Sequence, residues 1–498
     1  MNAHENGPEL ESEFGYKQEL PRVLRFWTNW AIAFAFISPI VGLYTVVALG
    51  MQTAGAAWVW TVAVVIVGQM LVAFVLAELS ARWPIAGGIY QWSGRLLGAK
   101  AGWWAGWVYG WAIIVTLALV AYGGGTFLGE LLGIDNPSHT TLVLLAVLVL
   151  VVITAVNLVG LHLLRYIVNI GIACEATATL GIGIVLWVFS RHQSPSVLFH
   201  ASGLEHHGLY VTAFVAALAP AGWVFLGFDT CGAIAEETHD PRRAVPRATW
   251  LSMLSVGIVD MIAATGIIVG QPNLEAAVSG KVADPISYAV TDALGSGVDK
   301  AFLAVLVAAF VSCGIAVEAG GVRLIYAYAR DDMLPFARVW RLVPERYPSP
   351  VFAVLLTGVL AGIVFLYANV LNVLVGFATG GYYLAFLLPV GAALYLRVKR
   401  RWRSDRRYFN LGRIGLGLTA AASIWLVVEF VNIAWPRSPE LPWYQNWAVI
   451  VASALLGIVG LGYFLVTRPD QKPGAAAAFG SAGSTFDLQD AAAPTGGD

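Results

Sequence analysis

The stretch GWVFLGFDTCGAIAEETHDPRRAVP, residues 222–246, carries the main clue to the fold of this chain. Its first half is apolar enough for a membrane-buried helix, yet three glycines and Asp229 interrupt it. Its second half changes abruptly to charged residues, prolines and a histidine. Irregular backbone at membrane depth is tolerated only where protein or a water-filled cavity surrounds it. The interruption therefore needs an explanation in the rest of the sequence.

Composition indicates a membrane protein built from helices. Of the 498 residues, 58% are hydrophobic and 12% are charged, whereas a soluble domain carries about 25% charged residues. Many apolar runs reach the roughly 20 residues that a helix needs to cross a bilayer. They are continuous and do not alternate with polar residues as the strands of a membrane β-barrel do. We therefore predict an all-α polytopic protein in the lipid bilayer, and the net charge of −1 gives no sign of a nucleic-acid partner.

Twelve apolar segments are predicted to span the membrane and to form one domain over residues 26–468. Their approximate cores are residues 28–50, 57–81, 103–130, 140–160, 166–190, 210–235, 248–270, 301–328, 351–368, 371–397, 413–435 and 446–467. Residues 1–25 form a polar N-terminal tail. Residues 469–498 are rich in Ala, Gly, Pro and Ser and have no core to bury, so we expect a disordered cytoplasmic tail there.

The distribution of Lys and Arg predicts the orientation. With twelve spans both termini lie on one side of the membrane, and that side holds all but four of the 29 Lys and Arg residues. The four exceptions are Arg191, Lys281, Lys300 and Arg437. Because cytoplasmic loops carry the excess of Lys and Arg, we expect a multi-pass protein of the cytoplasmic membrane with both termini in the cytoplasm.

The sequence lacks the common motifs of enzymes and cofactor-binding proteins. It contains no GxxxxGK[ST] phosphate loop, no HExxH and no GxSxG, which are motifs of nucleotide, zinc and acyl-transfer chemistry. Cys174, Cys231 and Cys313 lie inside apolar runs without the spacing of metal ligands. We therefore expect no enzymatic activity, no cofactor and no metal.

Two prolines lie near the middle of the first and sixth segments. Pro39 is followed closely by Gly42, and Pro220 by Gly222. Proline removes a helical hydrogen bond and crowds the preceding turn. Many secondary transporters consist of two inverted halves, each with one discontinuous helix. The matched prolines therefore predict halves over residues 28–190 and 210–398, with the last two segments outside the repeat; a simple proline kink is the alternative.

The two breaks predict a central binding site. Amide groups at the start of a half-helix favour an anionic group, and carbonyl groups at its end favour a cation. A zwitterion such as an amino acid supplies both charges. Trp223 and Phe225 would form an aromatic lid or apolar wall, with ordinary packing as the alternative. The predicted substrate-binding residues are Ser38, Pro39, Ile40, Val41, Gly42, Gly222, Trp223, Phe225 and Gly227.

Four segments resemble one family of transporters. Residues 227–248, GFDTCGAIAEETHDPRRAVPRA, resemble the sixth-span signature of amino acid–polyamine–organocation (APC) superfamily permeases. Residues 77–98, AELSARWPIAGGIYQWSGRLLG, are similar to the family's loop between spans 2 and 3. Residues 322–335, VRLIYAYARDDMLP, are similar to its span 8 exit. Residues 441–451, LPWYQNWAVIV, are similar to the amino acid/choline transporter branch.

This resemblance implies both a fold and a function. The fold is LeuT-like, with 5+5 inverted repeats, discontinuous helices 1 and 6, and two additional helices. The function is that of a permease, a secondary transporter for an amino acid or a related compound such as GABA, by proton symport or exchange. Glu236, Glu237, Arg242 and Arg243 would belong to an inner gate at the cytoplasmic end of span 6; a solvated loop with surface ion pairs is the alternative.

One departure from the family affects the substrate. Amino-acid carriers of the family often have a GxG in span 1, whereas SPIVGLY, residues 38–44, keeps only Gly42. Fewer glycines limit the close approach of a carboxylate to the backbone. The amino acid/choline branch also departs there and includes carriers of amines without an α-carboxylate. A transporter of an amine, choline or a polyamine is therefore the alternative.

Three acids inside the spans are candidates for ion coupling, because ionisable groups at membrane depth are costly. They are Glu175, Asp260 and Glu318. Glu175 follows Gly160 at the spacing where the resembling permeases place a lysine that substitutes for a coupling cation. Burial disfavours the charged form of a carboxylate, so Glu175 is expected to bind and release a proton. A structural, hydrogen-bonded acid is the alternative, and sodium coupling stays open.

Other classes of membrane protein fit less well. A ligand sensor on a permease scaffold would be expected to carry a sizeable structured extension, and a channel would be expected to have an uninterrupted pore lining. The substrate, the coupling ion, the direction of transport and the choice between monomer and homodimer stay open from the sequence.

Overall fold

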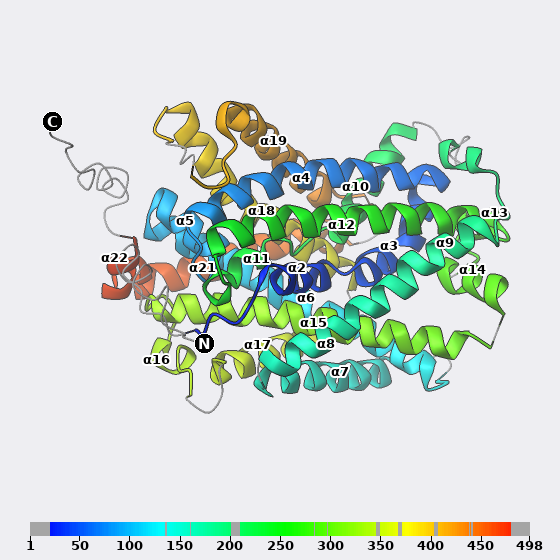
Figure 1. The fold of residues 1–498 in the computed structure, drawn as a ribbon, viewed down its shortest axis with the longest axis horizontal. Helices are drawn as coiled ribbons and strands as arrows, with labels where there is room; N and C mark the ends of the chain where they lie inside the picture. The colour runs from blue at the N-terminus through cyan, green and yellow to red at the C-terminus, as the bar shows by residue number, and fades with distance from the viewer. Residues whose placement is uncertain are drawn as a thin grey trace.

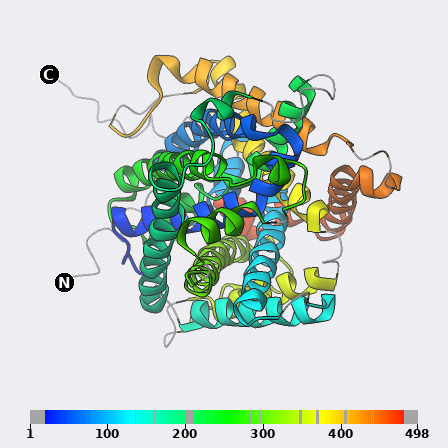
Figure 2. The same cartoon turned by 90° about the vertical axis from the view of Figure 1, so that its right-hand side faces the viewer.

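The computed structural model describes residues 20–134, 137–159, 161–200, 210–282, 284–295, 297–344, 349–366, 371–402, 407–437, 439 and 442–479. Every regular element within these residues is helical, and an isolated bridge joins Leu24 to Thr238. Figure 1 shows the long helices running in roughly one direction, and Figure 2 shows the same bundle from one end.

The long helices supply the body of the bundle. They are α2 (Phe26–Ile37), α3 (Pro39–Ala54), α4 (Val59–Arg82), α6 (Ala99–Leu131), α7 (His139–Val159), α8 (Leu161–Glu175), α10 (Tyr210–Val224), α12 (Pro241–Val269), α15 (Asp299–Arg330), α17 (Val351–Val364), α18 (Leu371–Val398), α19 (Gly415–Ala434) and α21 (Ala448–Thr467).

Shorter elements connect them. They are η1 (Ala56–Trp58), α5 (Ile89–Leu97), the π-helical turn η2 (Ala176–Gly181), α9 (Ile182–Val188), η3 (Pro195–Phe199), α11 (Thr230–Ala233), η4 (Ala235–Glu237), α13 (Leu274–Val278), α14 (Pro285–Leu294), α16 (Ala337–Trp340), η6 (Gly412–Ile414), α20 (Trp443–Asn446), η7 (Pro469–Gln471) and α22 (Pro473–Phe479).

The predicted all-helical membrane protein is confirmed. Ten helices within the described residues, some of them built from two adjoining elements, are long and apolar enough to cross a bilayer. The apolar helices α10 and α17 are shorter, with 15 and 14 residues. Each of the twelve predicted segments contains helix within the described residues. Helices α8 and α12 begin several residues before the predicted cores, because helix also forms over the charged residues near their starts, Arg165 in α8 and Arg242, Arg243 and Arg247 in α12.

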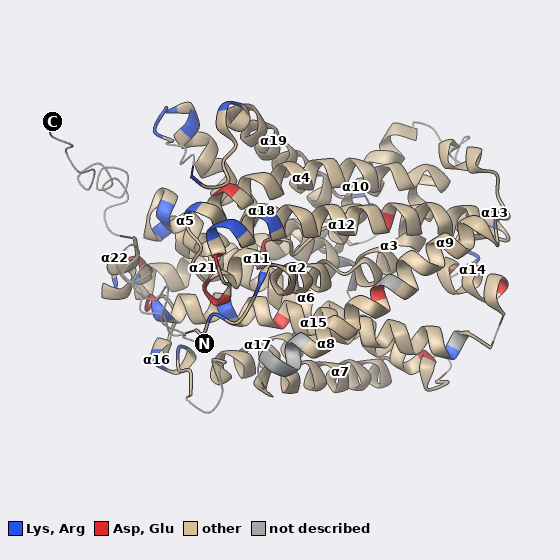
Figure 3. Ribbon diagram, in the orientation of Figure 1, with Lys and Arg blue, Asp and Glu red and all other residues tan. Residues whose placement is uncertain are grey.

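Charge is distributed unevenly along the bundle. Figure 3 shows Lys and Arg concentrated at the end that carries α5, α16 and α22. The opposite end, with α13 and α14, has few of them. One end of the bundle is therefore rich in Lys and Arg and the other is poor in them, as the sequence predicts.

The segment after α21 differs from the predicted disordered tail. Residues 469–479 form η7 and α22. Phe479 is buried, and its ring meets the ring of Tyr90 edge-on with 5.5 Å between centroids. The alanines and Phe479 give this short helix an apolar face, which docks against α5 and α6. Residues 480–498 lie outside the described residues.

Candidate functional site

The first helix break lies where the sequence predicts it. Helix α2 ends at Ile37, and α3 begins at Pro39. Ser38 between them is fully buried and has a φ of 47° and a ψ of 99°. Pro39 suits the first position of α3, because that position leaves a backbone N–H without a helical partner and proline has none. Pro39 therefore starts a new helix here and does not merely kink one.

Glu175 occupies the start of α3. The amide of Ile40 donates to Glu175 Oε2 at 2.9 Å, and the hydroxyl of Ser38 donates to Glu175 Oε1. The amide of Val41 donates to Ser38 Oγ at 3.2 Å, and the amide of Gly42 donates to the Ser38 carbonyl at 2.8 Å. The helix start that was predicted to bind an anionic group of the substrate therefore already holds a carboxylate of the chain itself.

A π-helical turn follows Glu175 directly. Such turns occur often at functional sites, because they insert an extra residue into a helix. The hydroxyl of Tyr44 on α3 donates to the carbonyl of Ala178 within this turn at 2.8 Å. The turn and Tyr44 thus fix the end of α8 against α3, which holds the Glu175 carboxylate beside the first break.

The second break lies later than the sequence predicts. Helix α10 continues through Pro220 and Gly222 to Val224, and the next helical residue is Thr230. Gly227 inside the break has a φ of 103°. A Cβ on Gly227 would overlap the ring of Phe36 on α2, so only glycine fits there. Proline removes one hydrogen bond from α10, whereas the left-handed Gly227 redirects the chain. The prediction of a break at Pro220 is therefore wrong.

A small cavity lies between the two breaks. Its lining residues are Phe36, Ile37, Val41, Gly42, Thr116, Val120, Trp223, Leu226 and Cys313. Its volume of about 20 Å³ holds about one water molecule. The indole of Trp223 donates to Thr45 Oγ1 at 3.1 Å, which ties α10 to α3. The structure therefore shows a closed form of the centre.

The predicted binding residues divide into two groups around this cavity. Val41, Gly42 and Trp223 line it. The other predicted residues lie at or near the breaks but are not among the described residues that line it: Ser38, Pro39, Ile40, Gly222, Phe225 and Gly227. Phe225 is fully buried, so in this closed form it belongs to the packing, whereas Trp223 faces the cavity.

Asp229 is not among the predicted site residues, although its charge interrupts the apolar sequence. Asp229 is buried in the second break, and Tyr109 of α6 donates a hydrogen bond to its Oδ2. Among the described residues, no hydrogen-bond partner reaches Asp229 Oδ1, while the hydroxyls of Thr230 and Thr116 lie near Tyr109 and Tyr382, respectively. Thr116 is also part of the cavity lining. The acidic residue inside the apolar GFD stretch was the available signal; Tyr109 in an apolar helix gave none.

The other two predicted coupling acids have different surroundings. Asp260 of α12 is fully buried, and neither carboxylate oxygen has a hydrogen-bond partner among the described residues. It interacts electrostatically with Glu175. Glu318 of α15 accepts hydrogen bonds from Thr154 Oγ1 and Asn157 Nδ2 of α7, both at 2.8 Å. Glu318 thus joins two helices, whereas Asp260 belongs to the surroundings of Glu175.

The predicted inner gate contains buried ion pairs with α15. Glu237 accepts a bidentate pair from Arg323, with Nε–Oε1 at 2.8 Å and Nη2–Oε2 at 3.2 Å. Glu236 accepts from Arg330 Nη1 at 3.0 Å and from the amide of Ala86 at 3.0 Å. Both glutamates are buried, so the alternative of a solvated loop does not describe them.

The predicted basic members of that gate lie elsewhere. The guanidinium of Arg242 lies 4.7 Å from the ring centroid of Tyr408, and Arg243 is exposed. The partners of the two glutamates are Arg323 and Arg330, which come instead from VRLIYAYARDDMLP, the segment that resembles the family's span 8 exit. The N-terminal segment adds to the closure, because the amides of Val23 and Leu24 donate to the Glu237 carbonyl at 2.9 and 2.8 Å.

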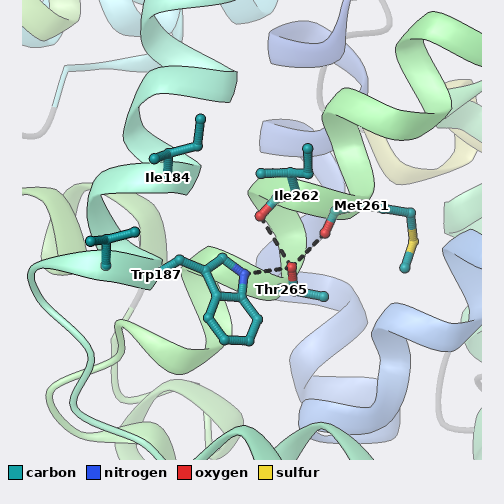
Figure 4. Close-up of a pocket in the computed structure, with 6 residues that line it drawn as sticks. Ile184, Trp187, Met261, Ile262 and Thr265 are labelled. Carbon is teal, nitrogen blue, oxygen red and sulfur yellow. Dashed lines mark hydrogen bonds between the residues drawn. The ribbon is translucent and has the colours of Figure 1, made fainter.

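A larger hollow lies on the outside of the bundle. It has a volume of about 380 Å³ and is lined by Ile184, Trp187, Val188, Met261, Ile262 and Thr265. Figure 4 shows the indole of Trp187 donating to Thr265 Oγ1, which in turn meets the carbonyls of Met261 and Ile262. Its polar groups thus bond to one another, and the open apolar hollow lacks the charged groups of the central breaks.

Known proteins similar to this chain are amino-acid permeases and related transporters. Residues 27–459 match the family described as amino acid permease. The chain is 25% identical to amino-acid permease BAT1 of Arabidopsis thaliana, over 91% of this chain and 93% of that protein. It is 24% identical to a putative amino acid/polyamine transporter of Macrophomina phaseolina, over 81% and 93%. It is also 24% identical to the GABA-specific permease of Saccharomyces cerevisiae, over 70% and 64%.

Proposed function

Because this chain belongs to the amino acid permease family, we propose that it moves an amino acid or a related compound such as GABA across the cytoplasmic membrane, by proton symport or exchange. The chain is a multi-pass membrane transporter and not an enzyme. The observation that carries the proposal is the closed cavity between two helix breaks, with a buried carboxylate at each break. A substrate with an ammonium group finds there the charges and carbonyl groups that it needs.

The proposed architecture has twelve spans in a LeuT-like 5+5 arrangement. One repeat comprises α2 to α9, and the other comprises α10 to α18, while α19 and α21 lie outside the repeat. Each repeat begins with a discontinuous helix, which supports the pairing. The concentration of Lys and Arg at one end of the bundle supports a cytoplasmic location for that end and for both termini.

Alternating access follows from these contacts. The cytoplasmic side is closed by the pairs Arg323–Glu237 and Arg330–Glu236, which join the segment after the second break to α15. Toward the other side, Trp223 of α10 lies over the cavity and bonds to Thr45 of α3. Opening inward requires the ion pairs to separate, and opening outward requires α10 to leave α3.

A specific observation favours amines as the second candidate class. Every N–H of the first turn of α3 from Ile40 to Gly42 is bonded, to Glu175 or to Ser38. A substrate carboxylate would therefore have to displace Glu175 before it could bind there. Asp229 Oδ1, in contrast, has no partner among the described residues. The centre is thus better prepared for a cation than for an anion, which suits GABA, choline or a polyamine as well as an α-amino acid.

A ligand screen tests the proposal and separates the two classes. Purified protein is heated with α-amino acids, GABA, choline or polyamines, and the midpoint of unfolding is measured. A true ligand stabilises the folded state by about 2.7 kcal/mol at a concentration 100 times its Kd. Stabilisation by α-amino acids supports the main proposal, and stabilisation by choline or polyamines alone supports the second. Failure of every compound to stabilise the protein and to enter proteoliposomes would contradict both.

Trp223→Ala is expected to raise the apparent KM or alter the selectivity of uptake. The substitution removes the bond to Thr45 and opens the cavity above Val41 and Gly42. Loss of one neutral hydrogen bond costs about 0.5–1.5 kcal/mol, so a change of roughly threefold to tenfold is expected. Uptake kinetics of a substrate panel in proteoliposomes measure it. Identical kinetics for the whole panel would show that Trp223 does not cover the substrate.

Glu175→Gln is expected to abolish accumulation driven by a proton gradient while exchange at equal pH continues. The amide can still accept from Ile40 N and donate to Ser38 Oγ, so the break keeps its geometry, but the group no longer titrates. The measurement compares gradient-driven uptake with exchange in proteoliposomes. Exposed Glu130 on α6, changed to Gln, is the matched control. Unchanged accumulation would leave Glu175 a purely structural acid.

A further inference from the structure

Another buried acid, Glu429, lies on α19, outside the proposed repeat. Glu429 is fully buried, and its two carboxylate oxygens accept from the Nδ2 group of Asn432 at 3.2 and 3.4 Å. No other hydrogen bond to this carboxylate is seen among the described residues. A charged carboxylate with a single amide donor is poorly compensated at membrane depth.

Asn432 connects Glu429 to α10. The same Nδ2 group donates to the carbonyl of Val215 on α10 at 2.9 Å. Arg437, beyond the end of α19, donates to the Asn432 carbonyl at 2.6 Å. Glu429 and Arg437 therefore both bond to Asn432, the residue that connects α19 to α10. Movement of α10 away from α19 would break the Val215 bond and expose this contact.

Tyr383 of α18 lies between the Glu429 site and the central cavity. Its hydroxyl would lie 3.0 Å from a Cβ on Gly222, which precedes the cavity-lining Trp223. Tyr383 also interacts electrostatically with Glu429 and lies beside Gln69 of α4. A row of polar groups thus extends from the wall of the central cavity to Arg437 near the end of α19.

Among the described residues, two titratable groups interact with Glu429. Tyr383 faces it from α18, and Arg437 faces it from the segment after α19. α4 contributes the neutral amide of Gln69, and α10 contributes the carbonyl of Val215. Arg437 lies outside the spans; burial lowers the pKa of its guanidinium, and the charge of Glu429 opposes that shift. Arg437 is exposed, so water reaches one end of the cluster.

We propose that Glu429 is a proton-binding site through which protons from the outer side control the contact between α10 and α19. The inference rests on the proposed transport function and adds a site that controls outer access. With α10 against α19, water is excluded and the protonated carboxyl is favoured. When α10 leaves, water reaches Glu429 through the Arg437 end, and the proton passes from the carboxyl to water. Outer acid therefore favours closure of α10 over the substrate.

Two readouts test this site in the intact protein reconstituted in lipid. The first is the carboxyl C=O band in infrared difference spectra between acidic and alkaline pH, which needs no substrate. The second is the apparent KM for radiolabelled GABA exchange as a function of outer pH. The variants are Glu429→Gln, Glu429→Asp and the control Glu130→Gln, an exposed acid near the same end of the bundle.

The expected result is specific to Glu429. Wild type and Glu130→Gln show a titrating carboxyl band that Glu429→Gln lacks. Their apparent KM changes about fivefold or more with outer pH, the lower range of coupling between two sites, and this change disappears in Glu429→Gln. Glu429→Asp keeps a titrating group and retains part of the change, which excludes misfolding as the cause.

Several outcomes would overturn the proposal. The band could persist in Glu429→Gln, or the KM could depend on outer pH equally in all variants or in none. If GABA is not transported, the proposed function fails for that compound, and the infrared band alone then decides whether Glu429 binds a proton. Absence of the band difference overturns the site independently of transport.

Discussion

Arg323→Met is expected to lower the free energy of unfolding by about 3–5 kcal/mol, the cost of leaving one partner of a buried ion pair without compensation. Arg323 and Glu237 are joined through two hydrogen bonds, and their side chains are 4% and 1% exposed. Methionine fills part of the space but leaves the Glu237 carboxylate without its bidentate donor. The measurement is the denaturant or thermal midpoint of the purified protein.

The double variant Arg323→Met/Glu237→Met is the control for this prediction. Replacing both members of a buried pair by apolar residues is often neutral or stabilising, so most of the lost stability is expected to return. Thiol modification provides a second readout: the single variant is expected to raise the modification rate of the buried Cys231, which precedes Glu237 on the same segment. A single variant as stable as wild type would show that the pair does not hold the cytoplasmic side closed.

Gly42→Val is expected to abolish substrate binding in a protein that still folds. Gly42 lines the cavity, and a Cβ there would lie 3.0 Å from both the carbonyl oxygen and the Cγ1 atom of Val224. Overpacking costs typically about 1–3 kcal/mol, which the two half-helices can relieve only by separating at the cavity. We expect a loss of roughly 100-fold or more in affinity, at the upper end of that range.

The matched control is Gly462→Val in α21. A Cβ on Gly462 meets no atom of the described residues within 4 Å, so the same added volume points into open space. Size-exclusion chromatography and the unfolding midpoint without ligand establish that both variants fold. Ligand-induced stabilisation then measures binding. Normal stabilisation of Gly42→Val would remove Gly42 from the substrate site, and equal losses in both variants would point to a general effect of valine.

The helices and the first helix break could be predicted, because each depends on residues that are close together in the sequence. Long apolar runs predict the helices, since lipid leaves no other way to satisfy the backbone. Pro39 predicts the first break, since a proline without an N–H begins a helix readily. The same argument was wrong for Pro220, where one missing hydrogen bond was absorbed within α10. The contact of Gly227 with Phe36 decided the position of the second break, and that contact joins segments far apart in the sequence.

The partners of the charged groups could not be predicted in this way. Glu236 and Glu237 are followed closely by Arg242 and Arg243, yet their buried partners are Arg330 and Arg323 of α15. Glu429 is not among the three predicted coupling acids, and the partner of its carboxylate, Asn432, contacts α10, which is far away in the sequence. An ion pair or a buried amide depends on which helices pack together, and hydrophobic periodicity carries no information about that choice.

The sequence by itself therefore determined the membrane environment, the approximate extents of the helices and the existence of a break at Pro39, since each follows from the cost of exposing polar groups to lipid. Only the tertiary structure decided that a carboxylate from α8 occupies the start of α3, where a substrate anion was expected. Glu175 and Ile40 are far apart in the chain but form a 2.9 Å hydrogen bond in the fold. The unpaired amides at the start of a helix attract a nearby anion. Because α8 packs beside the first break, that anion is the carboxylate of Glu175.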